Sequence, residues 1–234
     1  MVENPRTIKT YVLRAGRMTD AQKKAYGELK QKWAFEFKPG EKLCPCDLFG
    51  NNNPVICEIG FGMGAATAII AGENPGKNYL ALEVHTPGVA KLLQLIKENG
   101  LENIKIIQYD ALEVINSLPD KSLDGFHIFF PDPWPKKKHH KRRMITRPVT
   151  DLFCRKLRPG GYLYFVTDWE EYGYWAMEEL SNTPGLTNPY AGLTAGGGFA
   201  PCQDWRPRTK FEKKGIDAGR KIIEIIFNKE DENG

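Results

Sequence analysis

Short apolar runs alternate with helical segments along most of this chain. Five runs have the length and the β-branched or aromatic content of buried strands. They are Pro54–Gly60, Asn78–His85, Ile104–Ala111, Asp124–Asp132 and Gly161–Trp169. Segments with helical character lie between them, at Gly64–Ala71, Gly88–Asn99 and Thr146–Leu157. Strands and helices that alternate at this spacing predict an α/β fold, with a mostly parallel sheet and helices on both of its faces.

Both ends of the chain depart from this alternation. Residues 1–50 are polar and carry no clear strand, and their best helical segment is Thr19–Phe37. We therefore expect a partly flexible N-terminal extension, followed by one domain over residues 51–234. Within that domain, residues 182–202 are rich in Gly and Pro and have neither a helical nor a strand period, which predicts a long connection at the surface. Lys221–Lys229 has the pattern of a last buried strand.

The basic residues are gathered in one place. The chain has 234 residues and a formal net charge of only +4, from 33 Lys and Arg against 29 Asp and Glu. From Lys136 to Arg147, however, seven Lys or Arg and two His occur without a single acid. A basic surface of this kind suits a polyanion such as a nucleic acid. The sequence shows no signal peptide and no apolar run of membrane-spanning length, so we expect a cytoplasmic protein without a membrane partner.

The five cysteines form no C-x-x-C pair. Their odd number and the lack of a secretion signal predict reduced thiols. Cys44 and Cys46 could supply half of a zinc site, but no second pair of ligands has the required spacing. We therefore expect no bound metal.

The predicted strand ends carry the residues that could bind a ligand, because ligands of parallel sheets bind at the carboxyl ends of the strands. Acids stand at five successive ends, at Glu58, Glu83, Asp110, Asp132 and Asp168. The first run leads into a turn with Gly60, Gly62 and Gly64, whose bare backbone lets a ligand approach closely. Dinucleotide-binding proteins share turns of this kind, so the glycines alone leave the cofactor open.

Glu58 favours a cationic ligand at this turn. Its carboxylate would repel a pyrophosphate but attract the ammonium group of a methionine-derived cofactor. Glu83 can accept hydrogen bonds from both hydroxyls of a ribose, which fits NAD and S-adenosylmethionine equally well. Asp110 could accept a hydrogen bond from the amino group of an adenine. Together these acids favour S-adenosylmethionine as the cofactor.

Six motifs together resemble the bacterial tRNA (guanine-N7)-methyltransferase family. They are EIGFGMG from Glu58, LEVHTPGV from Leu82, QYDA from Gln108, FFPDPWPKKKHHKRRM from Phe129, TDWEEY from Thr167 and RPRTKFEKKG from Arg206. The resemblance covers Tyr11 to about Phe227. It implies a class I S-adenosylmethionine-dependent methyltransferase domain, with a Rossmann-like sheet of seven mostly parallel strands. It also implies methyl transfer from S-adenosylmethionine to N7 of a guanine in the tRNA variable loop, at position 46.

The resemblance also implies roles for individual residues. It makes Asp132 the catalytic residue and brings the cofactor to Glu58, Glu83, Asp110 and Asp132, beside the glycines of the turn. It implies that tRNA contacts Lys136, Lys138, His139, His140, Lys141, Arg142, Arg143, Asp168, Thr209, Lys210, Phe211 and Glu212. The chain matches the family pattern at each of these positions.

The chemistry of guanine N7 explains the residue types around Asp132. N7 has an outward lone pair and needs no general base, so the protein has to position the reactants and balance the charge that the purine acquires. Asp132 can act as a clamp and counter-charge, in a loop that the neighbouring prolines stiffen. Trp134 offers a flat face on which a splayed base could stack. Arg206 and Arg208 would extend the basic surface if the last loop folds over the same strand ends.

Three other functions stay open at this point. One is S-adenosylmethionine-dependent methylation of another target, such as an adenine, a protein amide or a small molecule. Another is RNA binding without catalysis, against which the retained acids argue. NAD-linked oxidoreduction fits least, because Glu58 disfavours a pyrophosphate. The sequence is compatible with a monomer and with a homodimer, and we expect tRNA as a partner but no obligate protein partner.

Overall fold

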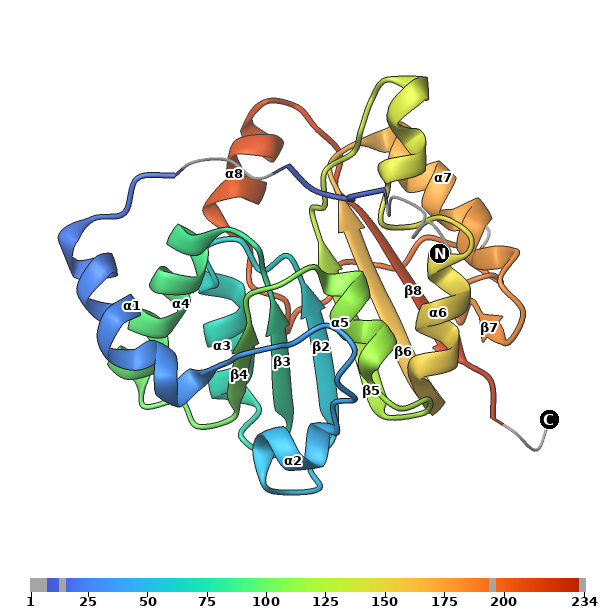
Figure 1. The fold of residues 1–234 in the computed structure, drawn as a ribbon. Coiled ribbons are helices and arrows are strands. Elements are labelled where there is room, and N and C mark those ends of the chain that lie inside the picture. Colours follow the sequence, from blue (N-terminus) through green and yellow to red (C-terminus); the bar gives the residue numbers. More distant parts are fainter. Residues whose placement is uncertain (1–7, 13–15, 194–196, 232–234) are drawn as a thin grey trace, which may run out of the picture.

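The computed structural model of the protein describes residues 8–12, 16–193 and 197–231. The strands are β1 (Ala34–Phe35), β2 (Val55–Ile59), β3 (Asn78–Leu82), β4 (Ile104–Ile107), β5 (Leu123–Phe129), β6 (Leu157–Thr167), β7 (Leu186–Thr187) and β8 (Ile223–Lys229). The α-helices are α1 (Asp20–Trp33), α2 (Pro45–Phe49), α3 (Ala65–Glu73), α4 (Thr86–Asn99), α5 (Ala111–Ser117), α6 (Val149–Lys156), α7 (Glu170–Ser181) and α8 (Lys210–Asp217), and η1 (Lys137–Arg142) is a 3-10 helix. Figure 1 shows these elements arranged around one sheet. Over the ranges described, no helix is both long enough and apolar enough to cross a membrane.

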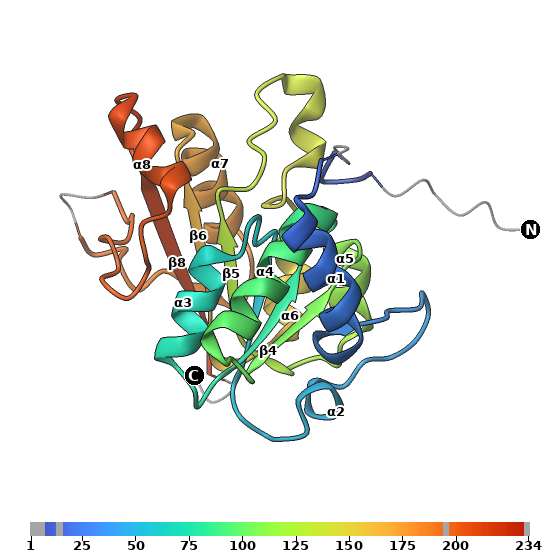
Figure 2. The same ribbon diagram turned by 90° about the vertical axis from the view of Figure 1, so that its left-hand side faces the viewer.

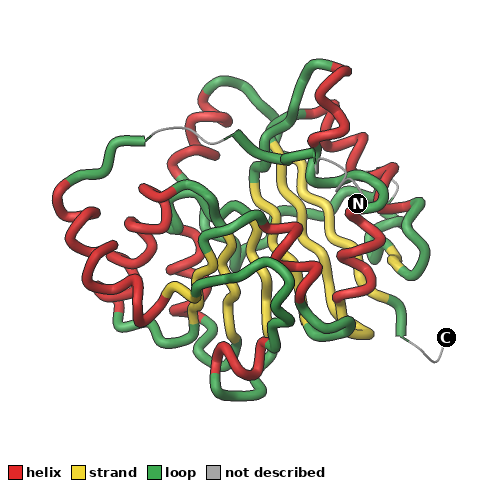
Figure 3. The backbone as a smooth tube through the Cα atoms, viewed as in Figure 1, coloured by secondary structure: helices red, strands yellow, loops and turns green. Residues whose placement is uncertain are grey.

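The strands form one sheet in the order β1-β4-β3-β2-β5-β6-β8-β7. The pairings from β1 to β6 are parallel, whereas β8 runs antiparallel to β6 and β7 antiparallel to β8. Figure 3 shows the larger strands side by side, with helices packed around them. The predicted α/β fold with a mostly parallel sheet is confirmed, but the sheet has eight strands and not seven.

Two of the strands, β1 and β7, lie outside the predicted strand segments, and β1 falls within residues 1–50, where the sequence predicts none. β1 has only two residues and pairs with β4 at the edge of the sheet. It directly follows α1, which begins with a capping box formed by Thr19 and Gln22. So short a strand shows no alternation that could reveal it in the sequence. Ala34 and Phe35 therefore belong to the same sheet as the strands after residue 51.

Helices cover both faces of the sheet. On one face, a cluster of buried side chains joins the strands to α2, α5, α6 and α7. On the other face, a second cluster joins them to α1, α3 and α4. The central strands β2 and β3 are buried along their whole length, and each large aliphatic side chain buried in this way contributes roughly 1.5–3 kcal/mol. Because both faces are covered, a ligand can reach the sheet only at the ends of its strands.

The connection at residues 182–202 contains a strand as well as loops. β7 lies within it and pairs with β8 at the second edge of the sheet, which corrects the prediction of a segment without strand structure. After the connection, the chain folds back towards the carboxyl ends of β5 and β6. Figure 2 shows that α8 stands at the same end of the molecule as η1. The segment that leads into α8 therefore returns to the strand ends, which is the condition under which it could extend the basic surface.

A buried network of charges holds α8 in this position. Arg206 is only 3% exposed and donates two hydrogen bonds to Glu212 in α8, at 2.7 and 2.8 Å. It also donates to Glu224 in β8 at 2.7 Å and to the hydroxyl of Tyr164 at 3.1 Å. Buried charges are tolerated when they are paired and hydrogen-bonded in this manner. The prediction that Arg206 extends the basic surface is therefore wrong, whereas Arg208 is exposed.

Replacing Arg206 by Ala would leave two buried carboxylates without their cation. We expect the free energy of unfolding to fall by about 3–5 kcal/mol. Arg208→Ala, an exposed arginine two residues further on, should change it by less than about 0.5 kcal/mol. Urea denaturation of both variants measures the difference, and similar losses in the two would contradict a stabilising role for the network.

Candidate active site

A cavity of about 390 Å³ opens at the carboxyl ends of β2, β3 and β5. Its lining comes from the loops that follow these strands and from the N-terminal segment. The lining residues are Thr10, Tyr11, Val12, Ile59, Gly60, Gly62, Leu82, Glu83, Val84, His85, Tyr109, Ala111, Phe130, Pro131, Asp132 and Met144. Gly60, Gly62, Glu83 and Asp132 are thus brought together, as the sequence predicts for a cofactor site.

The glycine turn between β2 and α3 meets the cavity at only two of its three glycines. Gly60 and Gly62 have φ angles of +73° and +58°, and a Cβ added at either position would meet no atom within 4 Å. A ligand can therefore lie directly against their backbone. At Gly64 an added Cβ would come within 2.8 Å of the Leu92 side chain in α4. Gly64 is buried by this helix packing and lies outside the cavity lining, so its contact with the cofactor stays a prediction.

Glu83 ties the glycine turn to the start of α4. Its carboxylate accepts hydrogen bonds from the backbone N–H groups of Gly62 at 2.9 Å, Val84 at 2.7 Å and His85 at 3.1 Å. Gly88 makes this close approach possible, because a Cβ there would lie 2.1 Å from the carbonyl oxygen of Gly62. The sequence did not predict this role of Gly88, although the residue stands in the LEVHTPGV motif. Both strand ends are thereby held as one rigid wall of the cavity.

Glu58 lies beneath the cavity wall and does not line it. Its side chain is 3% exposed, and its Oε2 atom has no hydrogen-bond partner among the described residues. Burial raises the pKa of Glu58 to about 7; the charge of Glu83 adds to the rise, and the hydroxyl of Thr67 opposes it. An unpaired buried carboxyl group at this turn is suited to a nearby ligand cation, because a positive charge would favour its ionised form.

Asp110 is occupied by groups of the protein itself. One carboxylate oxygen caps α5 by accepting from the N–H of Leu112 at 3.0 Å. The other forms an ion pair with Lys9 at 2.8 Å, and Lys9 also reaches Glu113 at 3.0 Å. Asp110 itself does not line the cavity, although its neighbours Tyr109 and Ala111 do. Its predicted bond to an adenine would require Lys9 to give way.

Residues 8–12, which we call the strap, lie across this cavity. Two residues of the Asp132 loop region hold the strap by its backbone. The indole N–H of Trp134 donates to the carbonyl of Thr10 at 3.2 Å, and the Arg142 guanidinium donates to the carbonyls of Lys9 and Tyr11, both at 2.9 Å. The sequence did not predict the strap, because so short a segment has no periodicity that would indicate its contacts.

Trp134 does not offer the free face that the sequence suggests. The Arg142 guanidinium lies 3.9 Å from the centroid of its ring, and His139 meets the indole edge-on with ring centroids 5.8 Å apart. With its N–H bonded to the strap, the indole is already packed on several sides. The stacking of a splayed base on Trp134 is therefore not supported by this arrangement.

Asp132 is the free acid of the site. It is exposed, lines the cavity and forms no hydrogen bond or ion pair within the part of the chain that the structure describes. Asp132 lies in the loop that follows β5. Two residues of this loop, Phe130 and Trp134, have positive φ angles of +52° and +48°. Backbone conformations of this kind are uncommon for bulky residues and tend to occur at functional sites. An unpaired carboxylate in such a loop can meet a ligand directly.

The lysines of the basic tract are exposed, whereas its arginines are buried to different degrees. Lys136, Lys137, Lys138 and Lys141 are exposed, and His139 and His140 are half-buried. Arg143, by contrast, is fully buried, donates to the carbonyl of Pro133 at 2.9 Å and pairs with Glu171. Arg143 therefore cannot contact RNA in this conformation, which corrects its prediction. Arg142 is held by the strap in the same way.

The predicted tRNA contacts on β6 and α8 are also divided. Asp168 forms an ion pair with Arg220 at 2.6 Å, a partner that the sequence reading missed. Thr209 caps α8 by accepting from the N–H of Glu212 at 3.2 Å. Lys210 and Phe211 are exposed, whereas Glu212 is 2% exposed and engaged by Arg206. Glu212 thus stabilises the fold here and does not face an RNA ligand.

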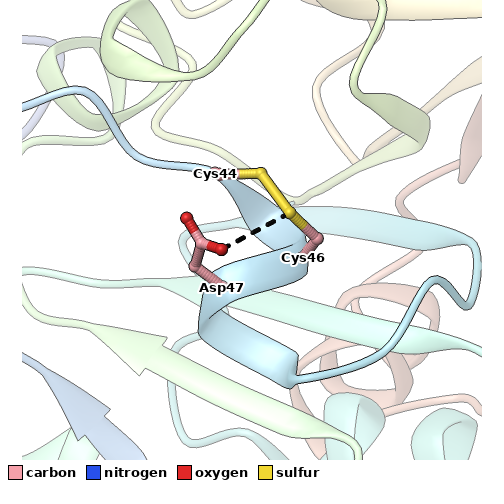
Figure 4. A group of neighbouring side chains, drawn as sticks. All are labelled: Cys44, Cys46 and Asp47. Atoms are coloured by element: carbon pink, nitrogen blue, oxygen red, sulfur yellow. Dashed lines mark hydrogen bonds between the residues drawn. A yellow bond between two sulfur atoms is a disulfide. The ribbon is translucent and has the colours of Figure 1, made fainter.

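A group of possible metal ligands, Cys44, Cys46 and Asp47, lies away from the cavity at the start of α2. Cys44 and Cys46 form a disulfide with a Cα–Cα distance of 5.4 Å, and Figure 4 shows Asp47 beside it. This pair corrects the prediction that all five cysteines are reduced, while Cys57, Cys154 and Cys202 are free. The ligand atoms of Cys44, Cys46 and Asp47 lie within 4.8 Å of one another, but sulfurs joined to each other do not offer the thiolates that zinc requires.

Sequence similarity agrees with this geometry. The family described as "Putative methyltransferase" matches residues 52–225. The chain is 45% identical over 232 residues to a protein named tRNA (guanine-N(7)-)-methyltransferase from Nitrosospira multiformis, with 98% of each chain covered. It is 46% identical to a protein of the same name from Chromobacterium violaceum, over 97% of this chain and 100% of the relative. This chain belongs to the tRNA (guanine-N7)-methyltransferase family.

Solved structures support the fold of this family member. The 16S rRNA methyltransferase KamB matches with a TM-score of 0.50 at 14% identity, over 93% of this chain and 96% of its own. An rRNA methylase from Streptococcus thermophilus also gives a TM-score of 0.50, at 12% identity, over 79% of this chain and 91% of its own. At such low identity the likeness concerns the fold alone, which is that of the class I methyltransferases.

The raised pKa of Glu58 predicts a stability that depends on pH. Because the folded protein holds the Glu58 proton more tightly than the unfolded chain, stability should fall as pH rises from the unfolded pKa of about 4.5 to the folded pKa of about 7. The full loss amounts to about 3 kcal/mol. Glu58→Gln removes this contribution, so urea denaturation at pH 5 and pH 8 should show a larger decrease in the wild type. Parallel decreases in both proteins would contradict the raised pKa.

Proposed function

We propose that this protein transfers a methyl group from S-adenosylmethionine to N7 of a guanine in tRNA, at position 46 in the variable loop. One observation carries the proposal. The unpaired carboxylate of Asp132 lines the cavity beside the glycine turn, and its loop leads directly into a surface of exposed lysines. A cofactor cavity and a polyanion-binding surface thus meet at one acid. The names of the relatives support tRNA as the substrate.

The residues of the cavity fit S-adenosylmethionine. When bound, this cofactor supplies an electrophilic methyl group on a sulfonium. Gly60 and Gly62 leave open backbone for its close approach. Glu83 stands at the end of β3, but three backbone N–H groups already occupy its carboxylate, so it can accept both ribose hydroxyls only after it gives up one of these bonds. Glu58 places a buried carboxyl group below the turn, and its Oε2 atom, which has no hydrogen-bond partner among the described residues, is suited to the cofactor ammonium. Asp110 can serve the adenine only after exchange of its ion pair with Lys9.

Asp132 balances charge during the reaction. The N7 lone pair of guanine forms the new N–C bond as the bond from carbon to sulfur breaks, and the positive charge moves from the sulfonium to the purine. No proton has to be removed, so a general base is unnecessary. A carboxylate that has no other partner can orient the reactants and stabilise the purine as its charge develops.

The exposed lysines hold the RNA. Lys136, Lys137, Lys138 and Lys141 extend from the Asp132 loop without a polar partner in the described part of the chain. Lys210 extends this surface from α8, at the same end of the sheet. Such ammonium groups bind phosphates as point charges and release counterions on binding. A tRNA substrate favours a reaction in the cytoplasm.

The proposed reaction can be tested directly with unmodified tRNA transcripts. We expect label from S-adenosylmethionine to enter a transcript that carries the variable-loop guanine, and strand scission at that base after borohydride and aniline treatment. A transcript in which only that guanine is changed should remain unlabelled. Asp132→Asn, which keeps the size of the side chain and removes its charge, should lower kcat by at least about 100-fold with an unchanged melting temperature. Normal turnover by this variant would contradict the role of Asp132.

The exposed lysines predict a specific dependence on salt. Lys138→Ala with Lys141→Ala should weaken tRNA binding and reduce the slope of log K against log salt concentration by about 1–2. As a matched control with the same change of charge, Lys24→Ala with Lys30→Ala on α1 should leave the slope near its wild-type value. Filter binding over a salt series measures both. An unchanged slope in the first variant would exclude these lysines as phosphate contacts.

A further inference from the structure

An exposed aromatic ring stands beside the cavity on α8. Phe211 is 53% exposed, and its ring lies 5.4 Å from that of Phe130 at an angle of 66°. Phe130 in turn lines the cavity next to Pro131 and Asp132. The pair therefore forms a continuous aromatic edge from the cofactor cavity to the outer surface.

Both rings are held in place from below. Phe130 adopts a left-handed backbone with φ +52°, and its N–H donates to the carbonyl of Val166 at 2.8 Å. The guanidinium of Arg206 lies 5.9 Å from the Phe130 ring centroid. Because Arg206 is itself fixed by two buried carboxylates, this side of the ring is supported by a rigid cation.

The same network decides which way Phe211 points. Glu212 is drawn into the protein by Arg206, so the preceding residue of the helix is turned towards solvent. Phe211 lies in the first turn of α8 beside the exposed Lys210, and Arg220 is 6.0 Å from its ring centroid. A large apolar ring displayed among cations has no evident role in folding. It suits a planar group attached to a phosphate backbone.

We propose that Phe211, which Phe130 supports edge-to-face, is the stacking platform for the target guanine, held out of the tRNA and over the Asp132 loop. This inference rests on the proposed function and names the residues that position its substrate. A base within a folded RNA has to leave its stack before it can enter a site of this kind, and aromatic side chains replace the lost stacking. The faces of the rings also favour the positive charge that the purine acquires on methylation.

Substitutions on α8 test the platform. Phe211→Ala should lower kcat/KM for tRNA by about 10- to 100-fold, with an unchanged Kd for S-adenosylmethionine. Phe211→Tyr keeps the ring and should retain most of the activity. Ile216→Ala removes another exposed apolar side chain of the same helix, 42% exposed, and should behave like the wild type. Wild-type kcat/KM in Phe211→Ala, or an equal loss in Ile216→Ala, would overturn the inference.

A binding cycle tests whether Phe211 contacts the target base itself. The affinities of the wild type and of Phe211→Ala are measured for two transcripts, one with guanine and one with an abasic nucleotide at the target position. We expect the substitution to weaken binding of the first transcript and to leave binding of the second unchanged. Equal weakening for both transcripts would place Phe211 against another part of the RNA and refute the platform.

The two proposals fail in different ways. If the wild type methylates tRNA at N7 and Phe211→Ala does so equally well, the platform is refuted and the function stands. If the wild type methylates no tRNA, the proposed function fails, and the binding cycle with the two transcripts still decides whether Phe211 stacks on that base.

Discussion

The burial of both faces of the sheet is the constraint from which the site follows. Since helices seal β2 and β3 from either side, only the loops at the carboxyl ends of the strands remain accessible to a ligand. Glu83 then locks two of these loops together by accepting backbone N–H groups from both. The order of the strands brings the Asp132 loop to the same place, because β5 lies beside β2 and its carboxyl end is therefore next to the glycine turn. The cavity is thus a result of topology, and its polar groups are supplied by the loops.

The cations of this protein serve two different purposes according to their chemistry. Arg142, Arg143 and Arg206 each bond several carbonyl or carboxylate oxygens at once, a task for which the fixed fork of a guanidinium is suited. The lysines of the same tract carry a compact, strongly hydrated charge and remain in solvent. A run that reads as one basic surface in the sequence is therefore part scaffold and part binding surface. The arginines hold the strap, the Asp132 loop and α8, and the lysines face the expected polyanion.

The strap and the aromatic pair of Phe130 and Phe211 are the parts of the site that differ most from the sequence prediction. The sequence suggests Trp134 as a place for a base, but the indole is covered by Arg142 and bonded to the strap. Phe130 and Phe211, 81 positions apart in the numbering, meet only because the buried Arg206 network folds α8 back over the strand ends. Neither residue has a local pattern that predicts this contact. Gly88 and Arg220 were missed for the same reason, since each acts on a residue from another element.

The sequence by itself determined the features that depend on short-range pattern. The alternating strands and helices, the glycine turn after β2, and the position of acids at the strand ends follow from local periodicity, and the structure contains each of them. Only the tertiary structure decided which of these residues are exposed to a ligand. Gly64 is turned inwards against Leu92 of α4, and Glu212 is turned inwards against Arg206, which Tyr164 of β6 and Glu224 of β8 hold in place. Burial depends on contacts between segments far apart in sequence, and residue type alone cannot encode it.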